Sequence, residues 1–225
     1  MKNFILFGAL SIAAPAMAQD ATPDIAPYLQ GGISGFGGGV SFGTGTAFRI
    51  RADLYHGISR TVNQTESGVR YQGKLKYSES GLFVDWFPSS SRFRLSGGAF
   101  FNRSQIDLNG NAANGTSADI NGRSYALSGA DSVSASVRWP SVMPYLGVGW
   151  GMGPSDKGWN FTADLGVALG RPKTTLEVSP SIRAKITGAG LNADNELDAE
   201  RQQFQDSANK YFVYPVARAG ISYKF

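Results

Sequence analysis

The last 14 residues of the chain alternate between apolar and polar positions up to the carboxyl end. A period of two residues predicts a β-strand whose two faces meet different surroundings. One face carries Val213, Pro215, Ala217, Ala219, Ile221, Tyr223 and Phe225, and the other carries Arg218, Ser222 and Lys224.

The same alternation recurs through the middle of the chain. Several strands of about 10 residues, most of them without a helix between them, predict an all-β fold, either a closed barrel or a sandwich. The longer segments are 48–55, 93–102, 132–139 and 159–169, and shorter ones are 36–42, 145–152 and 175–179.

One segment changes its apolar face partway along. Tyr71, Leu75 and Tyr77 put that face on odd positions, whereas Leu82 and Trp86 put it on even positions. A single extra residue reverses every side chain that follows it. We therefore expect a β-bulge at 78–81, and two separate short strands are the alternative.

The predicted connections fall into two classes of length. Tight ones are expected at 43–46, 88–91, 140–144 and 170–173, and long ones at 59–67, 103–124 and 180–210. Short turns at one end and long loops at the other are typical of outer-membrane barrels. The sequence thus predicts a closed antiparallel transmembrane β-barrel of eight strands, with ten as the competitor.

One helix is predicted in the connection before the last strand, at 194–209. Leu197, Phe204 and Ala208 form a narrow apolar stripe, and acidic residues such as Asp194 and Glu196 crowd the first turns, where they suit the helix dipole. A narrow stripe indicates a surface or plug-like helix beside the barrel mouth.

The character of the two faces separates a membrane barrel from a soluble one. Trp86, Trp139, Trp150 and Trp159 lie near predicted turns on apolar faces, as in interfacial aromatic girdles. Charges of both signs on the polar faces would fill and close an eight-stranded lumen, whereas ten strands would leave a narrow, weakly anion-favouring pore. The expected lumen charges are Arg49, Arg51, Asp53, Asp85, Arg94, Asp164, Glu177 and Arg218, and Lys74, Lys76 and Arg138 also lie on polar faces.

The amino-terminal segment and the composition fit an exported protein. Residues 1–18 have the pattern of a secretory signal peptide, with Lys2 before an apolar run and Ala16-Met17-Ala18 as the cleavage site, which leaves 19–225 as one domain. The chain has 29 glycines and 12% aromatic residues, a pairing that suits barrel strands. A net charge of +4 without a basic cluster argues against nucleic acid as a partner.

The terminal Tyr223-Lys224-Phe225, the signal peptide and the phrases LFVDWFP, RFRLSGGAFFN and PYLGVGWG resemble small Gram-negative outer-membrane β-barrel proteins of a functionally uncharacterised proteobacterial family. The resemblance covers nearly the whole mature chain. It implies residence in the cell outer membrane, contact with membrane lipid and lipopolysaccharide, and recognition of Tyr223 and Phe225 by the barrel-assembly machinery. It implies no reaction.

Candidate chemistry is sparse. His56 is the sole histidine, and with Ser59 it is a weak candidate for a lipid A-modifying enzyme. Asp107, Asn109 and Asn111 resemble the start of a calcium loop, but Ala112 and Ala118 stand where that loop requires glycine and a carboxylate. We expect no enzyme, metal or cofactor, and a structural or adhesive function in the loops 103–124 and 180–210.

Overall fold

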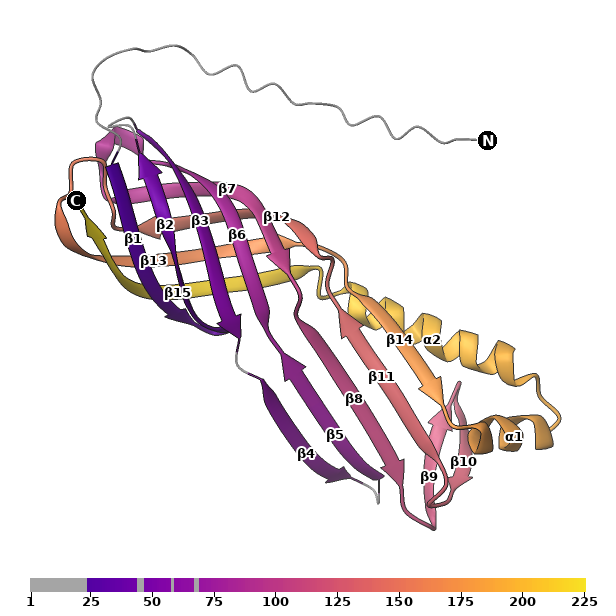
Figure 1. The fold of residues 1–225 in the computed structure, drawn as a ribbon. Helices are drawn as coiled ribbons and strands as arrows, with labels where there is room; N and C mark the ends of the chain where they lie inside the picture. The colour runs from indigo at the N-terminus through magenta and orange to yellow at the C-terminus, as the bar shows by residue number, and fades with distance from the viewer. Residues whose placement is uncertain (1–23, 44–46, 58, 67–68) are drawn as a thin grey trace, which may run out of the picture.

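The computed structural model describes residues 24–43, 47–57, 59–66 and 69–225. The predicted signal peptide lies outside these residues. The molecule is elongated, with a β-barrel at one end and a sheet with two helices at the other (Figure 1).

Eight antiparallel strands close the barrel in the order β1-β15-β13-β12-β7-β6-β3-β2. This confirms the predicted closed fold and the count of eight rather than ten. The strands are β1 (Asp24–Gly32), β2 (Gly35–Gly43), β3 (Phe48–Gly57), β6 (Ser78–Trp86), β7 (Phe93–Asn102), β12 (Val142–Trp150), β13 (Gly158–Leu169) and β15 (Val213–Lys224).

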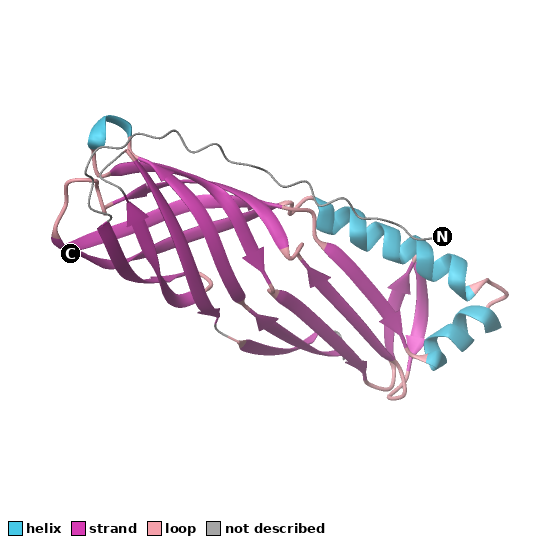
Figure 2. Cartoon of the chain, turned by 45° about the horizontal axis from the view of Figure 1, so that its top comes forward, coloured by secondary structure: helices cyan, strands magenta, loops and turns pink. Residues whose placement is uncertain are grey.

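A second sheet continues one side of the barrel wall. Its strand order is β14-β11-β8-β5-β4. Each of these strands is adjacent in sequence to the corresponding strand of the barrel order β13-β12-β7-β6-β3, so the two sheets have the same arrangement. We call this sheet, with the hairpin β9–β10 and the helices, the extension (Figure 2). Its strands are β4 (Arg60–Glu66), β5 (Val69–Lys76), β8 (Gln105–Ala112), β9 (Thr116–Ile120), β10 (Arg123–Leu127), β11 (Ser132–Arg138) and β14 (Lys173–Val178).

Several predicted connections therefore need correction. Residues 59–66 and 103–124 are largely strands rather than polar loops, and the predicted strands 132–139 and 175–179 belong to the extension rather than to the barrel. The predicted turns 140–144 and 170–173 are instead short passages between extension and barrel, at 139–141 and 170–172, with the adjoining residues in β12 and β14. The first barrel strand, β1, was missing from the predicted set because Pro27 and two glycines weaken its alternation.

The barrel has one end with tight turns, which we call the turn end. The described connections there are the 3₁₀ helix η1 (Pro88–Ser90) and 151–157, whereas most of the predicted tight turn at 43–46 lies outside the described residues. β1 begins and β15 ends at the same place, where Lys224 Nζ lies 2.7 Å from an Asp24 carboxylate oxygen. This ion pair joins the two strands that close the barrel.

The predicted bulge at 78–81 is wrong, and the alternative of two strands holds. β5 ends at Lys76 and β6 begins at Ser78, with Tyr77 between them. The apolar face changes there because the chain leaves the extension and enters the barrel wall, so the two strands need not share a face.

Apolar side chains cover the outside of the barrel. Trp86, Trp150 and Trp159 are exposed near the turn end, with Leu54 and Leu146 farther up the wall. A belt of this kind is stable only in hydrocarbon, with the indole rings at its margin. Trp139 does not belong to it, since it lies half-buried beyond the barrel and its indole N–H donates to the Tyr211 carbonyl.

The helices pack on the extension. α1 (Pro180–Gly188) was not predicted, whereas α2 (Ala193–Asn209) confirms the predicted helix. Asn192 caps α2 by accepting from the Asp194 and Asn195 amides. Leu197 is buried against Ile182 and Ile186 of α1 and against the β9–β10 hairpin. No helix in the described part of the chain is long and apolar enough to cross a membrane.

Candidate functional site: a closed lumen beneath a junction cavity

The barrel interior holds a continuous network of paired charges. At its centre Arg94 lies 2.8 Å from Asp164, and Arg51 lies 2.9 Å from Asp85 and 3.2 Å from Asp164. Gln30 donates to Asp164 at 2.7 Å. All these side chains are buried, so each charge depends on its partners rather than on bulk water.

The network continues toward both ends of the lumen. At the turn end Arg49 and Lys224 both pair with Asp24. Toward the extension Arg218 lies 3.2 Å from Asp53 and 2.8 Å from Glu79, with its guanidinium over the Tyr55 ring at 3.6 Å. The ion pairs thus extend along the whole barrel.

The structure places every lumen candidate except Glu177 inside the barrel. Glu177 lies on β14 in the extension, as Lys74, Lys76 and Arg138 lie on β5 and β11. Three charges of the lumen network were missed, namely Asp24, Glu79 and Lys224. Glu79 was hidden in the supposed bulge, although it shares the inward alternation of Phe83 and Asp85. With these residues the described part of the lumen holds five cations and five carboxylates, and it lacks the net positive charge that Lys74, Lys76 and Arg138 would have added.

Inward-facing glycines make room for the large lumen side chains. A Cβ at Gly149 would lie 2.6 Å from Arg94 Nε, and one at Gly166 would lie 2.2 Å from the Tyr145 hydroxyl. Tyr145 packs edge-on against Phe83, with ring centroids 4.7 Å apart. These glycines therefore allow large side chains to fill the lumen.

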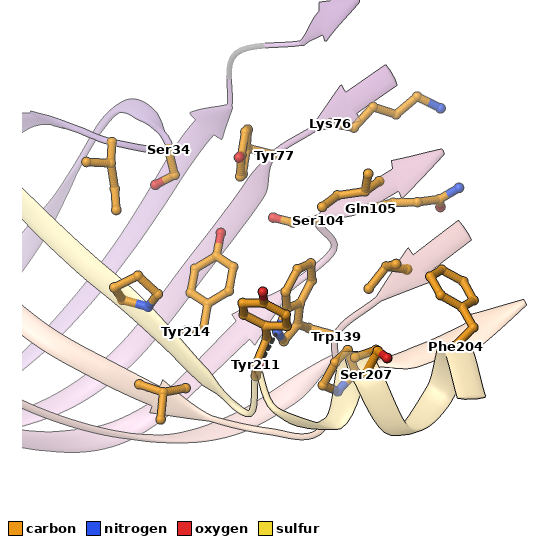
Figure 3. Close-up of a pocket in the computed structure, with 17 residues that line it drawn as sticks. Ser34, Lys76, Tyr77, Ser104, Gln105, Trp139, Phe204, Ser207, Tyr211 and Tyr214 are labelled. Carbon is orange, nitrogen blue, oxygen red and sulfur yellow. Dashed lines mark hydrogen bonds between the residues drawn. The ribbon is translucent and has the colours of Figure 1, made fainter. Parts of the chain in front are cut away.

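A cavity of about 490 Å³ lies where the barrel meets the extension. It is lined by side chains from several elements: Ser34 from the β1–β2 turn, Tyr77 and Ser104 from strand passages, Phe204 and Ser207 from α2, and Trp139, Tyr211 and Tyr214. Figure 3 shows the rings of Tyr77, Trp139, Phe204 and Tyr214 around a common space. Lys76 and Gln105 extend away from these rings (Figure 3). We call this space the junction cavity.

The floor of the junction cavity is the top of the lumen network. The Tyr214 hydroxyl donates to Glu79 at 2.6 Å, and the Ser34 hydroxyl donates to the other Glu79 oxygen at 2.8 Å. That second oxygen also lies against Arg218. The Trp139 and Tyr214 rings meet edge-on at 5.6 Å. A molecule in the cavity would therefore rest on a floor tied to the buried charges.

The other candidates do not assemble into a site. His56 faces outward on β3 beside the Phe36 ring, and in the described residues no hydrogen bond joins it to Ser59. Asp107, Asn109 and Asn111 lie within strand β8 rather than in a loop. The described residues contain no cluster of three His, Cys, Asp or Glu side chains suited to a metal ion. Tyr223 and Phe225 stack edge-on at 5.0 Å at the turn end.

A closed eight-stranded barrel with an apolar outer belt and a charged, filled lumen defines an integral outer-membrane β-barrel protein. Solved structures share this fold. The chain is similar to CarO2 of Acinetobacter baumannii, with a TM-score of 0.59 and 19% identity over 90% of this chain and 98% of that one. CarO of the same organism has a TM-score of 0.57 and 17% identity over 89% and 97%. Neither a protein-family model nor a curated protein matches the sequence.

Proposed function

We propose that the protein is a non-enzymatic outer-membrane barrel that binds small, mostly apolar molecules in the junction cavity. The observation that carries this proposal is the cavity itself, which the long connections build over a closed lumen. Its volume of about 490 Å³ falls within the range of about 300–1,000 Å³ that is usual for small-molecule sites.

The cavity would face the outside of the cell. Outer-membrane barrels keep their short turns in the periplasm and their long connections outside. The short connections η1 and 151–157 would mark the periplasmic end, so the extension and the junction cavity would lie at the other. A ligand would thus arrive from the medium.

The lining indicates the chemistry of the ligand. Five aromatic rings supply flat apolar area, and the hydroxyls of Ser34, Ser104 and Ser207 add hydrogen-bonding capacity at the edges. A planar aromatic molecule with one or two polar groups suits such a surface, because rings stack or meet edge-on at little entropic cost. No charged group points toward the ring cluster in Figure 3, so a neutral ligand fits better than an ion.

Binding can be tested with indole as the probe. We expect saturation-transfer NMR to detect indole on the wild-type protein in lipid nanodiscs. Ser207→Trp would fill the cavity from an exposed position of α2 and abolish the transfer. Gln202→Trp, on the same helix but outside the lining, is the matched control and should retain it.

Equal transfer in the Ser207→Trp and wild-type proteins would refute the proposal. Trp139→Ala provides a second test of indole binding, because it removes the cavity ring that packs against Tyr214. We expect it to weaken indole binding about two- to tenfold, since aromatic pairs contribute about 0.5–1.5 kcal/mol beyond their buried area.

A further inference from the structure

A second hollow lies on the lipid-facing wall of the barrel, over β2, β3, β6 and β7. A lower section of about 550 Å³ is lined by outward residues such as Gly38, Ala52 and Leu82. An upper section of about 450 Å³ shares Leu54, Ser80 and Phe101 with the lower one. We call the two sections together the wall groove, which runs along the belt toward the extension.

The wall groove exists because small outward residues stand beside large ones. Gly38 is paired with Leu54 across β2 and β3, and Leu54 is paired with Ser80 across β3 and β6. Leu54 is 73% exposed, so its side chain stands clear of the wall beside these two small residues. In a membrane this groove must be filled by hydrocarbon, because the residues that line an empty groove would lose their dispersion contacts.

The groove carries one outward charge, at its upper end. Three charged residues line it, but Asp53 and Glu79 are buried and pair inside the lumen with Arg218. Arg103 is exposed. Its backbone N–H donates to the Ser78 carbonyl at 2.9 Å, which fixes it beside the groove, and Ser141 lies in the same lining.

We infer that the wall groove binds one molecule of lipid A, the phosphorylated acyl anchor of lipopolysaccharide, with an acyl chain along Ala52 and Ser80 and a phosphate on Arg103. A guanidinium is the side chain best shaped to hold a phosphate. With the orientation proposed above, Arg103 at the extension end of the belt lies at the level of the outer leaflet, where lipid A is the main lipid.

A second copy of the chain is a poorer occupant of this surface. A two-fold contact would bring the same face of both copies together. The wall groove would then bring two Arg103 side chains near each other, without an outward carboxylate among its lining residues to balance them. An anionic lipid matches both the charge and the apolar channel below it.

Native mass spectrometry of lipid-free, refolded protein titrated with lipid A tests the inference. We expect one lipid A per barrel. Arg103→Glu should lower the affinity about tenfold or more, because hydrogen bonds to charged groups contribute about 1.5–3 kcal/mol. Ser80→Phe should fill both sections of the groove and lower the affinity similarly.

Two matched variants control for general damage. Ala99→Phe adds the same ring at an outward position of β7 that does not line the groove, and Arg123→Glu makes the same charge change in the β9–β10 hairpin. Both should bind like wild type, and heat-modifiable migration in gels should show that all four variants are folded. Unchanged affinity in Arg103→Glu and Ser80→Phe would overturn the inference. So would phosphatidylglycerol binding with the same affinity and the same dependence on these residues.

Discussion

Asp164 is the residue whose loss should most disturb the lumen. Its carboxylate lies between two buried guanidinium groups, at 2.8 Å from Arg94 and 3.2 Å from Arg51, and it accepts from Gln30 at 2.7 Å. Asp164→Asn keeps the shape of the side chain but removes the charge. Asp85 is then the one carboxylate left against both guanidinium groups.

The expected cost is large because the remaining charges stay buried. Removing one partner of a buried ion pair costs about 3–5 kcal/mol. For a slope of about 2–3 kcal/mol per molar urea, the unfolding midpoint should fall by about 1–2 M. Tryptophan fluorescence of the barrel in phospholipid vesicles, checked against heat-modifiable migration, measures this midpoint.

The matched control is an ion pair that solvent reaches. Asp198 and Arg201 of α2 lie 2.7 Å apart, but their side chains are 69% and 39% exposed. Asp198→Asn should cost no more than about 0.5 kcal/mol. Equal midpoint shifts for the two variants would show that the lumen charges are as well hydrated as the surface pair, and the reasoning about a filled interior would be wrong.

Three further predictions concern the extension, the enzyme alternative and assembly. Burial opposes ionisation of Asp131, but hydrogen bonds, above all from Lys185, outweigh it and hold the pKa of that carboxyl below its usual value. The stabilisation by ionised Asp131 is therefore present above the unfolded-state pKa of about 3.9 and is lost as the pH falls below that value. Hydrogen exchange in α1 should become faster at such a low pH, and Asp131→Asn should remove this pH dependence. Lipid A from cells that express His56→Ala should match wild type in mass spectra, and a change in acylation that depends on His56 would support the enzyme. Deleting Phe225 should lower the amount of heat-modifiable barrel in outer membranes, and an undiminished yield would refute its role as an insertion signal.

The alternation of the sequence predicted the barrel because each barrel strand has lipid on one side and the lumen on the other. Phe48, Ile50 and Leu54 face out while Arg49, Arg51 and Asp53 face in, and the structure places them so. Lipid and lumen differ strongly, so the signal survives in a single sequence.

The extension gave a weaker signal. Alternation at 132–139 and 175–179 was recognised but assigned to the barrel, and the other extension strands were missed. Every described side chain of β4 is exposed. Apolar and polar residues therefore need not alternate along this strand, and its sequence resembles that of a polar loop. β8 and β11 are likewise rich in Asn and Ser, and their pairing rests on backbone hydrogen bonds to neighbours that are distant in sequence. The junction cavity was unpredictable for the same reason, because Ser34, Tyr77, Trp139 and Phe204 meet only once those strands pair.

The central claim is that the barrel is a closed scaffold for a binding site rather than a channel. Planar-bilayer recording of the purified protein tests it directly. The paired charges and the aromatic layer of Phe83, Phe100 and Tyr145 predict no steady unitary conductance at any voltage that the bilayer withstands. Reproducible unitary steps from the wild-type protein, absent from a preparation that lacks it, would contradict the claim and identify a narrow pore.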